Sequence, residues 1–435
     1  MGRPAKLHPE NALNDALSEV IRLFPAEEIR EAAKVTGFTQ RLRKVDAALF
    51  FWNLILGFSC SVQRTLAGLK RQYQQIADTE IAPSSFFGRF SPNLVCFLRR
   101  LLQDALAKFA SPALPGTLGT LFKDISIFDN TIVTLSKSLL GIFPGTATEA
   151  AAKITVVLSV ASQTARSVTI HAGNVAEIKT IKIGAWVRDH LLLFDLGFFK
   201  YGFFAKIVEF GGHFISRLRD AANPVIVAVN RLHRGRAIDL VGKSLKEIRD
   251  SLKRQEIDAI VEVEFRRRGY AGAEGRRERI TFRLVGVRDE AIDAYHFYLT
   301  DLPPEALPAE QIANLYRGRW FIEMLFKELK SRYALDVIQT SSREIVEAMI
   351  YAALLTLTVS RAMFLKYQAH YRRANQRLTT ARWSIMFYEN VSQLMVRILR
   401  KTGINPDLDQ LLAQSLMEAG DPTPHRERLD DVFDF

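Results

Sequence analysis

The sequence predicts an α/β protein in which a mixed β-sheet is flanked by helices and preceded by a helical N-terminal region. Residues 1–115 have helical periodicity and many basic side chains, and a segment rich in Pro, Gly and Thr, Ser111–Thr120, closes this region. From Phe122 onward, short runs alternate between apolar and polar side chains, which is typical of strands with one buried face. The apolar stretch Ile345–Tyr367 then returns to helical character.

The charge balance of the 435-residue chain indicates a polyanionic partner. It carries 59 Lys and Arg against 47 Asp and Glu, a net charge of +12, and neutralising phosphates with such a surplus releases counterions. No apolar run reaches the roughly 20 residues that span a bilayer, so we expect no membrane partner and a cytoplasmic, nucleoid-associated protein. The two cysteines, Cys60 and Cys96, are expected to be buried thiols.

The N-terminal region combines helices with basic side chains. A turn at Thr36–Phe38 is followed by a basic run that contains Arg41, Arg43 and Lys44. A helix, a short turn and a basic helix are compatible with helix-turn-helix reading of DNA. They are equally compatible with a plain helical bundle that has a solvated charged surface.

The strand-like runs after Ser111–Thr120 follow the order of an RNase H-like sheet: three strands, a helix, a strand, a helix and a further strand. The short helix after the third strand is expected at Ile178–Val187. The strands are predicted at Phe122–Leu135, Lys153–Val160, Ser167–Ala172, Leu191–Phe194 and Phe214–Arg219. The later helix is predicted at Phe199–Phe210.

Two aspartates in these strands are candidate functional residues. Asp129 lies in the middle of the first strand, where a carboxylate is costly unless it has a partner or a metal. Asp195 directly follows the fourth strand. Because the first and fourth strands are neighbours in an RNase H-like sheet, the two side chains can share a site. Asp124 is the rival for the first position, and each aspartate taken alone is better explained as a capping or turn residue.

Three more strand-like runs precede the next helix, at Glu262–Arg267, Arg279–Arg288 and Ala294–Thr300, with a glycine-rich turn between the first two. They predict a β-strand insertion with a basic face. The arginines of that face are Arg266, Arg267, Arg268, Arg276 and Arg277.

The segment Leu315–Ser331 is predicted to be a helix with one polar stripe. On a continuous helix, Tyr316, Arg319, Glu323 and Lys330 fall within a sector about 60° wide. A phenol, two cations and a carboxylate would then face the same way. The alternative is a solvated charged face with pairs three or four residues apart.

These residues resemble a known family. Tyr316, Arg319, Glu323 and Lys330 match the Y-R-E-K signature of the insertion-sequence-four family of DDE transposases in residue type and spacing. Asp129, Asn130 and Thr131 resemble the first aspartate motif of that family, in which Gly more often stands at the position of Asn130. The second motif is similar to residues 195–198, Asp-Leu-Gly-Phe.

The resemblance implies roles for single residues. Asp129, Asp195 and Glu323 would be the metal-binding catalytic carboxylates, and Tyr316, Arg319 and Lys330 would hold phosphates of the transposon end. The run that contains Arg41, Arg43 and Lys44 resembles the N-terminal region of the family and favours binding of DNA ends. Two Mg²⁺ ions, with Mn²⁺ as a substitute, would activate the attacking oxygen and stabilise the leaving oxygen at phosphorus.

The whole chain is thus expected to be the transposase of an insertion sequence, acting on its own terminal inverted repeats and on target DNA, as a homodimer on DNA. The expected domains are 1–115 (DNA-end binding), 116–242 and 309–370 (RNase H-like core), 243–308 (β insertion) and 371–435 (C-terminal helices). Two alternatives stay open: an inactive DNA-binding protein with the same fold, and a stand-alone RNase H-superfamily nuclease. Relatives that form a DNA hairpin use a tryptophan of the insertion, and none of the four tryptophans lies there.

Overall fold

A computed structural model of the chain describes residues 8–40, 45–58, 65–109, 114–146, 148–230, 239–267, 275–289, 291, 293–335, 338 and 340–407. The predicted basic residues Arg41, Arg43 and Lys44 therefore lie outside the described residues. The chain forms two compact units. The first consists of Met1–Ala105, Ser331–Leu335 and Glu344–Phe435, and the second of Leu106–Lys330 and Asp336–Arg343.

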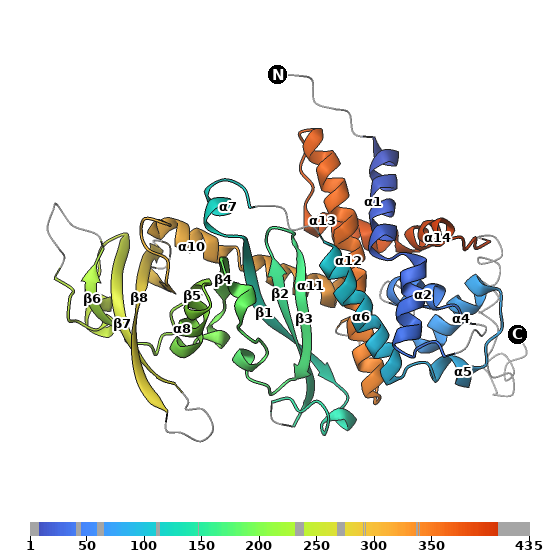
Figure 1. Cartoon of the computed structure of the whole chain (residues 1–435), viewed down its shortest axis with the longest axis horizontal. Coiled ribbons are helices and arrows are strands. Elements are labelled where there is room, and N and C mark those ends of the chain that lie inside the picture. Colours follow the sequence, from blue (N-terminus) through green and yellow to red (C-terminus); the bar gives the residue numbers. More distant parts are fainter. Residues whose placement is uncertain are drawn as a thin grey trace, which may run out of the picture. The chain divides into compact units, whose positions relative to one another are not determined.

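The second unit is built on one nine-stranded sheet of order β3-β2-β1-β4-β5-β9-β8-β7-β6 (Figure 1). Its strands are β1 (Asp124–Leu135), β2 (Ala150–Ser159), β3 (Thr164–Ala172), β4 (His190–Phe194), β5 (His213–Arg217), β6 (Val225–Val229), β7 (Glu256–Arg267), β8 (Arg276–Asp289) and β9 (Ala294–Thr300). β1 pairs antiparallel with β2 and parallel with β4, and β4 pairs parallel with β5. This mixed sheet confirms the predicted RNase H-like fold class.

The strands of the predicted insertion continue that sheet, because β9 pairs antiparallel with β5. β6 was not predicted from the sequence. The helices of this unit are α7 (Thr117–Leu121), α8 (Tyr201–Glu209), α9 (Leu245–Ile248), α10 (Ala309–Arg317) and α11 (Trp320–Arg332), the last ending in the first unit. The predicted helix at Ile178–Val187 is wrong, since two separate 3-10 turns, η3 (Glu177–Lys179) and η4 (Ala185–Val187), occur there.

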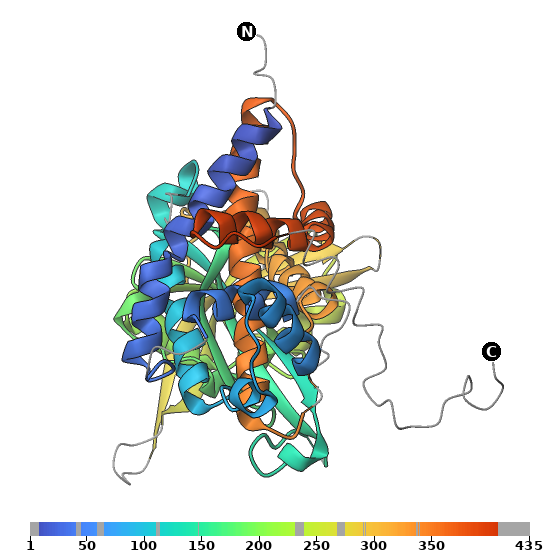
Figure 2. The same ribbon diagram turned by 90° about the vertical axis from the view of Figure 1, so that its right-hand side faces the viewer.

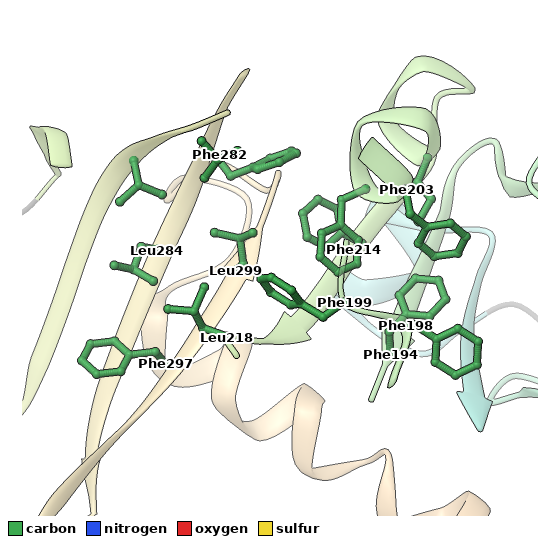
Figure 3. Close-up of a cluster of buried hydrophobic side chains, with 14 of the residues drawn as sticks. Phe194, Phe198, Phe199, Phe203, Phe214, Leu218, Phe282, Leu284, Phe297 and Leu299 are labelled. Carbon is green, nitrogen blue, oxygen red and sulfur yellow. The ribbon is translucent and has the colours of Figure 1, made fainter. Parts of the chain in front are cut away.

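One phenylalanine-rich core joins β4 and β5 to the insertion strands β7, β8 and β9 (Figure 3). Phe204 of α8 stacks on Phe214 of β5 with ring centroids 4.4 Å apart, and Phe214 meets the edge of Phe282 of β8 at 5.1 Å. Full burial of one such ring contributes about 1.5–3 kcal/mol. The insertion is therefore packed into the same core as the strands that carry the candidate aspartates.

The first unit is helical, and its long helix α12 (Arg343–Arg373) runs beside α1 and α6 (Figure 2). Tyr351 of α12 accepts a hydrogen bond from Arg99 of α6 at 2.9 Å, and Lys366 pairs with Glu19 of α1 at 3.1 Å. The other helices are α2 (Ala26–Val35), α3 (Ala47–Trp52), α4 (Leu66–Ala77), α5 (Pro83–Phe87), α13 (Thr380–Glu389) and α14 (Val391–Lys401), while α1 spans Pro9–Leu23 and α6 spans Pro92–Lys108.

The structure bears on two expectations about this unit. By length and composition α12 could cross a membrane, but 94% of its most apolar 18-residue stretch is buried inside the protein. That burial identifies it as a core helix. Cys96 is exposed on α6 and is not the buried thiol that the sequence predicted, because it lies on the polar face of an amphipathic helix.

Candidate active site

The parallel pairing of β1 with β4 places the two aspartates next to each other. In this register Phe128 lies opposite Phe194, so Asp129 and Asp195 follow at the same level on neighbouring strands. Asp129 continues in β1, whereas Asp195 directly follows β4 and caps the short turn η5 (Leu196–Phe198). The backbone of the sheet thus directs two carboxylates to one place, as the sequence order predicted.

The predicted helix Leu315–Ser331 is not continuous, and its interruption matters for the site. α10 ends at Arg317 and α11 begins at Trp320. Between them the backbone tightens, with Gly318 N–H donating to Leu315 O and Arg319 N–H to Tyr316 O. A Cβ on Gly318 would lie 2.9 Å from Leu315 O, so glycine permits this turn.

The Arg319 guanidinium is the point on which three carboxylates converge. Its Nη1 donates to Asp129 Oδ2 at 3.0 Å, and its Nη2 donates to Glu323 Oε1 at 2.6 Å. Its Nε lies 4.0 Å from Asp195 Oδ1. The side chain of Arg319 is only 17% exposed. Three acidic residues from three separate segments of the chain therefore surround one cation.

Asp129 is the carboxylate most affected by this environment. Burial raises the pKa of Asp129 to about 6, and the negative charges of Asp195 and Glu177 also raise it. The Asn130 N–H and the charge of Arg319 act in the opposite direction. A negative charge at this position is therefore unfavourable unless more positive charge is brought to the site.

The other two signature residues differ in their position. The Tyr316 ring packs on Tyr298 of β9 with centroids 5.2 Å apart, and the Arg319 guanidinium lies 5.9 Å from the Tyr316 centroid. Burial raises the pKa of Tyr316 to about 12, so its hydroxyl stays protonated. Lys330 is half-buried on α11, and in the described residues no hydrogen bond or ion pair joins it to the three carboxylates.

Asp124, the rival of Asp129, lies at the start of β1 and has structural partners. Its Oδ1 accepts hydrogen bonds from the backbone N–H groups of Ile125 and Ala161 at 2.8 and 3.1 Å. Its other oxygen lies 3.8 Å from Arg166. These contacts give the buried Asp124 side chain hydrogen-bonding and ionic partners within the fold.

Comparisons with known proteins agree with this geometry. The family described as "Transposase DDE domain" matches residues 120–359, more than half of the chain. The chain is 25% identical to the transposase for insertion sequence element IS231B of Bacillus thuringiensis subsp. berliner, over 97% of this chain and 96% of the relative. It is 23% identical to the transposase for IS1151 of Clostridium perfringens, over 78% of each chain.

Among solved structures, a cryo-EM structure of the piggyBac transposase synaptic complex with hairpin DNA is similar, with a TM-score of 0.49, 11% identity and coverage of 96% of this chain and 87% of the other. The chain belongs to the DDE transposase family. It is accordingly a DNA-cleaving and strand-transferring enzyme, of a class that generally depends on divalent metals.

The donor set fits a divalent cation. Hard divalent cations take oxygen ligands, and Asp129, Asp195 and Glu323 offer carboxylates that already gather around a positive charge. As the described side chains stand, no three acidic, histidine or cysteine residues are grouped tightly enough to hold an ion. The guanidinium of Arg319 lies among these three carboxylates.

Sequence reasoning missed two features near this site. Glu177 lies close enough to act on Asp129, but it was assigned to no motif. Trp320 and Phe321 at the start of α11 are 61% and 69% exposed, next to Arg319 in the chain. Unusual exposure of aromatic side chains cannot be read from the sequence, because the predicted helix gave them an apolar face to pack.

Proposed function

We propose that this protein is the transposase of an insertion sequence of the insertion-sequence-four family, which cleaves and joins DNA at the terminal inverted repeats of its own element. The observation that carries this proposal is the convergence of Asp129, Asp195 and Glu323 on Arg319. Those four residues come from β1, the end of β4 and the α10–α11 junction. Matching residues in the same order carry the Y-R-E-K and aspartate motifs of that family.

In this proposal the three carboxylates hold two Mg²⁺ ions, and Mn²⁺ can replace them. Bound ions would activate the attacking oxygen, first water and later a 3′-hydroxyl, and stabilise the leaving oxygen in an in-line displacement at phosphorus. With a pKa of about 6, Asp129 is already mostly ionised at neutral pH, and bound divalent cations would lower its pKa further. No histidine or cysteine ligand is needed.

Arg319 exchanges partners in this proposal. All three of its nitrogen atoms face carboxylates. A DNA phosphate would therefore have to compete with these carboxylates for the guanidinium N–H groups of Arg319. With divalent cations bound by the carboxylates, the Arg319 guanidinium would be available to bind a phosphate of the transposon end, where bidentate contacts are strong. Tyr316, with its protonated hydroxyl, and Lys330 supply further phosphate contacts.

The partners follow from the same proposal. The basic surplus of the chain binds DNA, the N-terminal region with Arg41, Arg43 and Lys44 recognises the element ends, and two copies act together on DNA in the cytoplasm, without a membrane partner. The domain division at 115, 242, 308 and 370 belongs to this proposal as well. An inactive DNA-binding protein of the same fold and a stand-alone nuclease without end specificity are the alternatives that the experiment separates.

The experiment uses the full chain with labelled DNA that carries the inverted repeats flanking its gene. Asp129→Asn, Asp195→Asn and Glu323→Gln should each lower cleavage and strand transfer by at least about a thousandfold in Mg²⁺ or Mn²⁺, because each removes a negative ligand. Binding of the ends should change little, since Lys and Arg contacts elsewhere supply most of the affinity.

Asp124→Asn is the matched control. The amide oxygen can still accept the two backbone hydrogen bonds of Asp124, so this variant should remain active. Full activity in all three site variants would refute the transposase mechanism. An inactive Asp124→Asn beside an active Asp129→Asn would show that Asp124 is the first ligand.

A further inference from the structure

Glu177 brings a fourth carboxylate to the edge of the site. It begins η3, in the segment between β3 and β4, and η3 lies beside η5, the turn that follows Asp195. The resemblance to known transposases assigned no role to this residue. It is half-buried, and its backbone carbonyl accepts the hydrogen bond of Thr180 that closes the turn.

The side chain of Glu177 occupies the space that a side chain at position 197 would need. A Cβ built on Gly197 would lie 1.7 Å from Glu177 Oε2, 2.3 Å from its carboxyl carbon and 2.9 Å from Oε1. The carboxylate therefore rests directly on the backbone two residues after Asp195. The glycine at position 197 of this motif is what lets a second acidic group approach the end of β4 so closely.

The carboxylate has no partner that explains this position. Within the described part of the chain, no hydrogen bond or ion pair is found for the Glu177 side chain. Its charge acts on Asp129, which is itself buried. A half-buried carboxylate without a hydrogen-bonding or ionic partner among the described residues, placed against the turn that follows Asp195, is available as an oxygen ligand for a cation.

We propose that Glu177 is a fourth acidic residue of the divalent-cation site, bound to an ion or to a water molecule in its coordination shell. The inference rests on the proposed function, since it requires the cation site of Asp129, Asp195 and Glu323. Mg²⁺ keeps several water ligands, and residues that hold such waters change metal affinity by about 10–100-fold when they are removed. Glu177 would also compensate part of the positive charge of two divalent ions, which three carboxylates leave in excess.

The test measures Mn²⁺ binding to the full-length protein by electron paramagnetic resonance, without DNA, so that it does not depend on activity. Glu177→Gln removes the charge and should raise the Kd for Mn²⁺ by about 10-fold. Gly197→Ala keeps the charge but displaces the flexible carboxylate, and it should raise the Kd several-fold, by about 3–10. Asp195→Asn is the reference for a direct ligand and should raise it by at least as much as Glu177→Gln.

The control variant is Glu310→Gln, which removes the same charge from an exposed position of α10 and should bind Mn²⁺ as the native protein does. The melting temperatures in EDTA should be the same or higher for Glu177→Gln, which separates a ligand from a structural group. A melting temperature in EDTA that falls together with metal affinity would assign Glu177 a structural role and overturn the inference.

The remaining outcomes are also decisive. Native affinity in Glu177→Gln and Gly197→Ala beside weak binding in Asp195→Asn would overturn the role of Glu177 and leave the proposed function intact. Weaker Mn²⁺ binding by Glu177→Gln together with native Mn²⁺ affinity in Gly197→Ala would show that Glu177 affects binding only through its net charge. That result would contradict a position of Glu177 at the ion. Native affinity in Asp195→Asn would refute the proposed cation site, and the role of Glu177 with it.

Discussion

At the scale of single residues, the site is electrostatically incomplete in the free protein. Asp129 is buried among acidic neighbours, and one arginine serves three carboxylates. Such an arrangement is expected in a cation-binding site. Bound cations would neutralise the excess negative charge and so stabilise the folded protein. Removing the negative charge of Asp129 and removing the positive charge of Arg319 should therefore have different, measurable effects.

Asp129→Asn should stabilise the metal-free protein. The pKa of Asp129 is about 6 in the folded chain and 3.8 in the unfolded chain. Between pH about 4 and 6 the folded chain keeps a proton that the unfolded chain has lost, so the free energy of unfolding falls as pH rises through this window. Above it, the neutral asparagine should raise that free energy by roughly 1–3 kcal/mol.

Denaturant unfolding in EDTA at pH 5 and pH 8 measures this effect. The gain of Asp129→Asn should be larger at pH 8, and the native protein should recover the difference when Mg²⁺ is added. Asp124→Asn is the control, and it should show no such gain. A gain for Asp129→Asn that is equal at both pH values would contradict the assignment of the effect to a proton on Asp129.

Arg319→Ala should have opposite effects on the two ligands of the site. Without the guanidinium, the carboxylates lose their internal cation, so Mn²⁺ should bind the DNA-free protein more tightly. Binding of the element ends should weaken, and the slope of log K against log salt should fall by about 1, because one phosphate contact is lost. Lys330→Ala should flatten the slope in the same way and leave Mn²⁺ binding unchanged.

Arg317→Ala is the matched control, because Arg317 lies two residues away and donates only to Asn314 in the contacts described here. Arg317→Ala should change neither the affinity for Mn²⁺ nor the salt slope of DNA-end binding. If Arg319→Ala leaves both the Mn²⁺ affinity and the salt slope at native values, the exchange of partners is wrong.

At the scale of elements, the sequence predicted the strands better than the signature helix. Alternation of apolar and polar side chains is a local signal, and it located β1 with Asp129 and β4 with Asp195. The helix Leu315–Ser331 was predicted as one rod, but it breaks at Gly318. Glycine adopts a tight turn at little cost in free energy. The contacts of Arg319 with Asp129 and Asp195 join residues that are far apart in the sequence, so the periodicity of the helix itself does not reveal them.

Glu177 was missed for the same reason. Its position depends on the absence of a side chain at Gly197, a contact between two turns that are separated by β4. The sequence around it predicted a helix, Ile178–Val187, because its residues have helical spacing. In the structure, short 3-10 turns take its place, and the Glu177 carboxylate lies against Gly197 of the turn η5.

We predict that exposed aromatic side chains at the start of α11 contact DNA bases. Trp320 and Phe321 are exposed beside Arg319 and Glu323, and aromatic side chains in nucleic-acid sites stack on bases with about 1–3 kcal/mol each. Trp320→Ala and Phe321→Ala should therefore weaken binding of element ends that carry unpaired bases by about 5–100-fold. Trp320→Phe should keep most of the affinity.

Binding of end DNA with and without unpaired terminal bases provides the measurement. Met386→Ala removes an apolar side chain from α13 that is 50% exposed and should have no effect. A loss that is the same for fully paired and unpaired ends would argue against base stacking and for a general contact with DNA.

At the scale of the second unit, the β insertion helps to position the signature helices. Arg283 of β8 is 2% exposed and makes two hydrogen bonds to Asp258 of β7, at 2.8 and 2.6 Å. Its Nη1 also donates to Leu302 O and Leu307 O, on the segment that leads into α10. The insertion therefore holds the chain just before the junction that delivers Arg319 and Glu323.

Phe282→Ala tests whether insertion and catalytic strands form one cooperative structure. Phe282 of β8 packs on Phe214 of β5 inside the shared core, and loss of a buried phenylalanine costs about 3–5 kcal/mol. If the nine strands unfold together, native-state hydrogen exchange should accelerate by a similar factor in β4 and β5 as in β7 and β8, and cleavage activity should fall at a temperature where the native protein is active. Val227→Ala, an exposed position on β6, is the control and should change neither. Faster exchange confined to β6, β7 and β8 would show that the insertion unfolds as a separate module, and Asp195 at the end of β4 would then keep its protection.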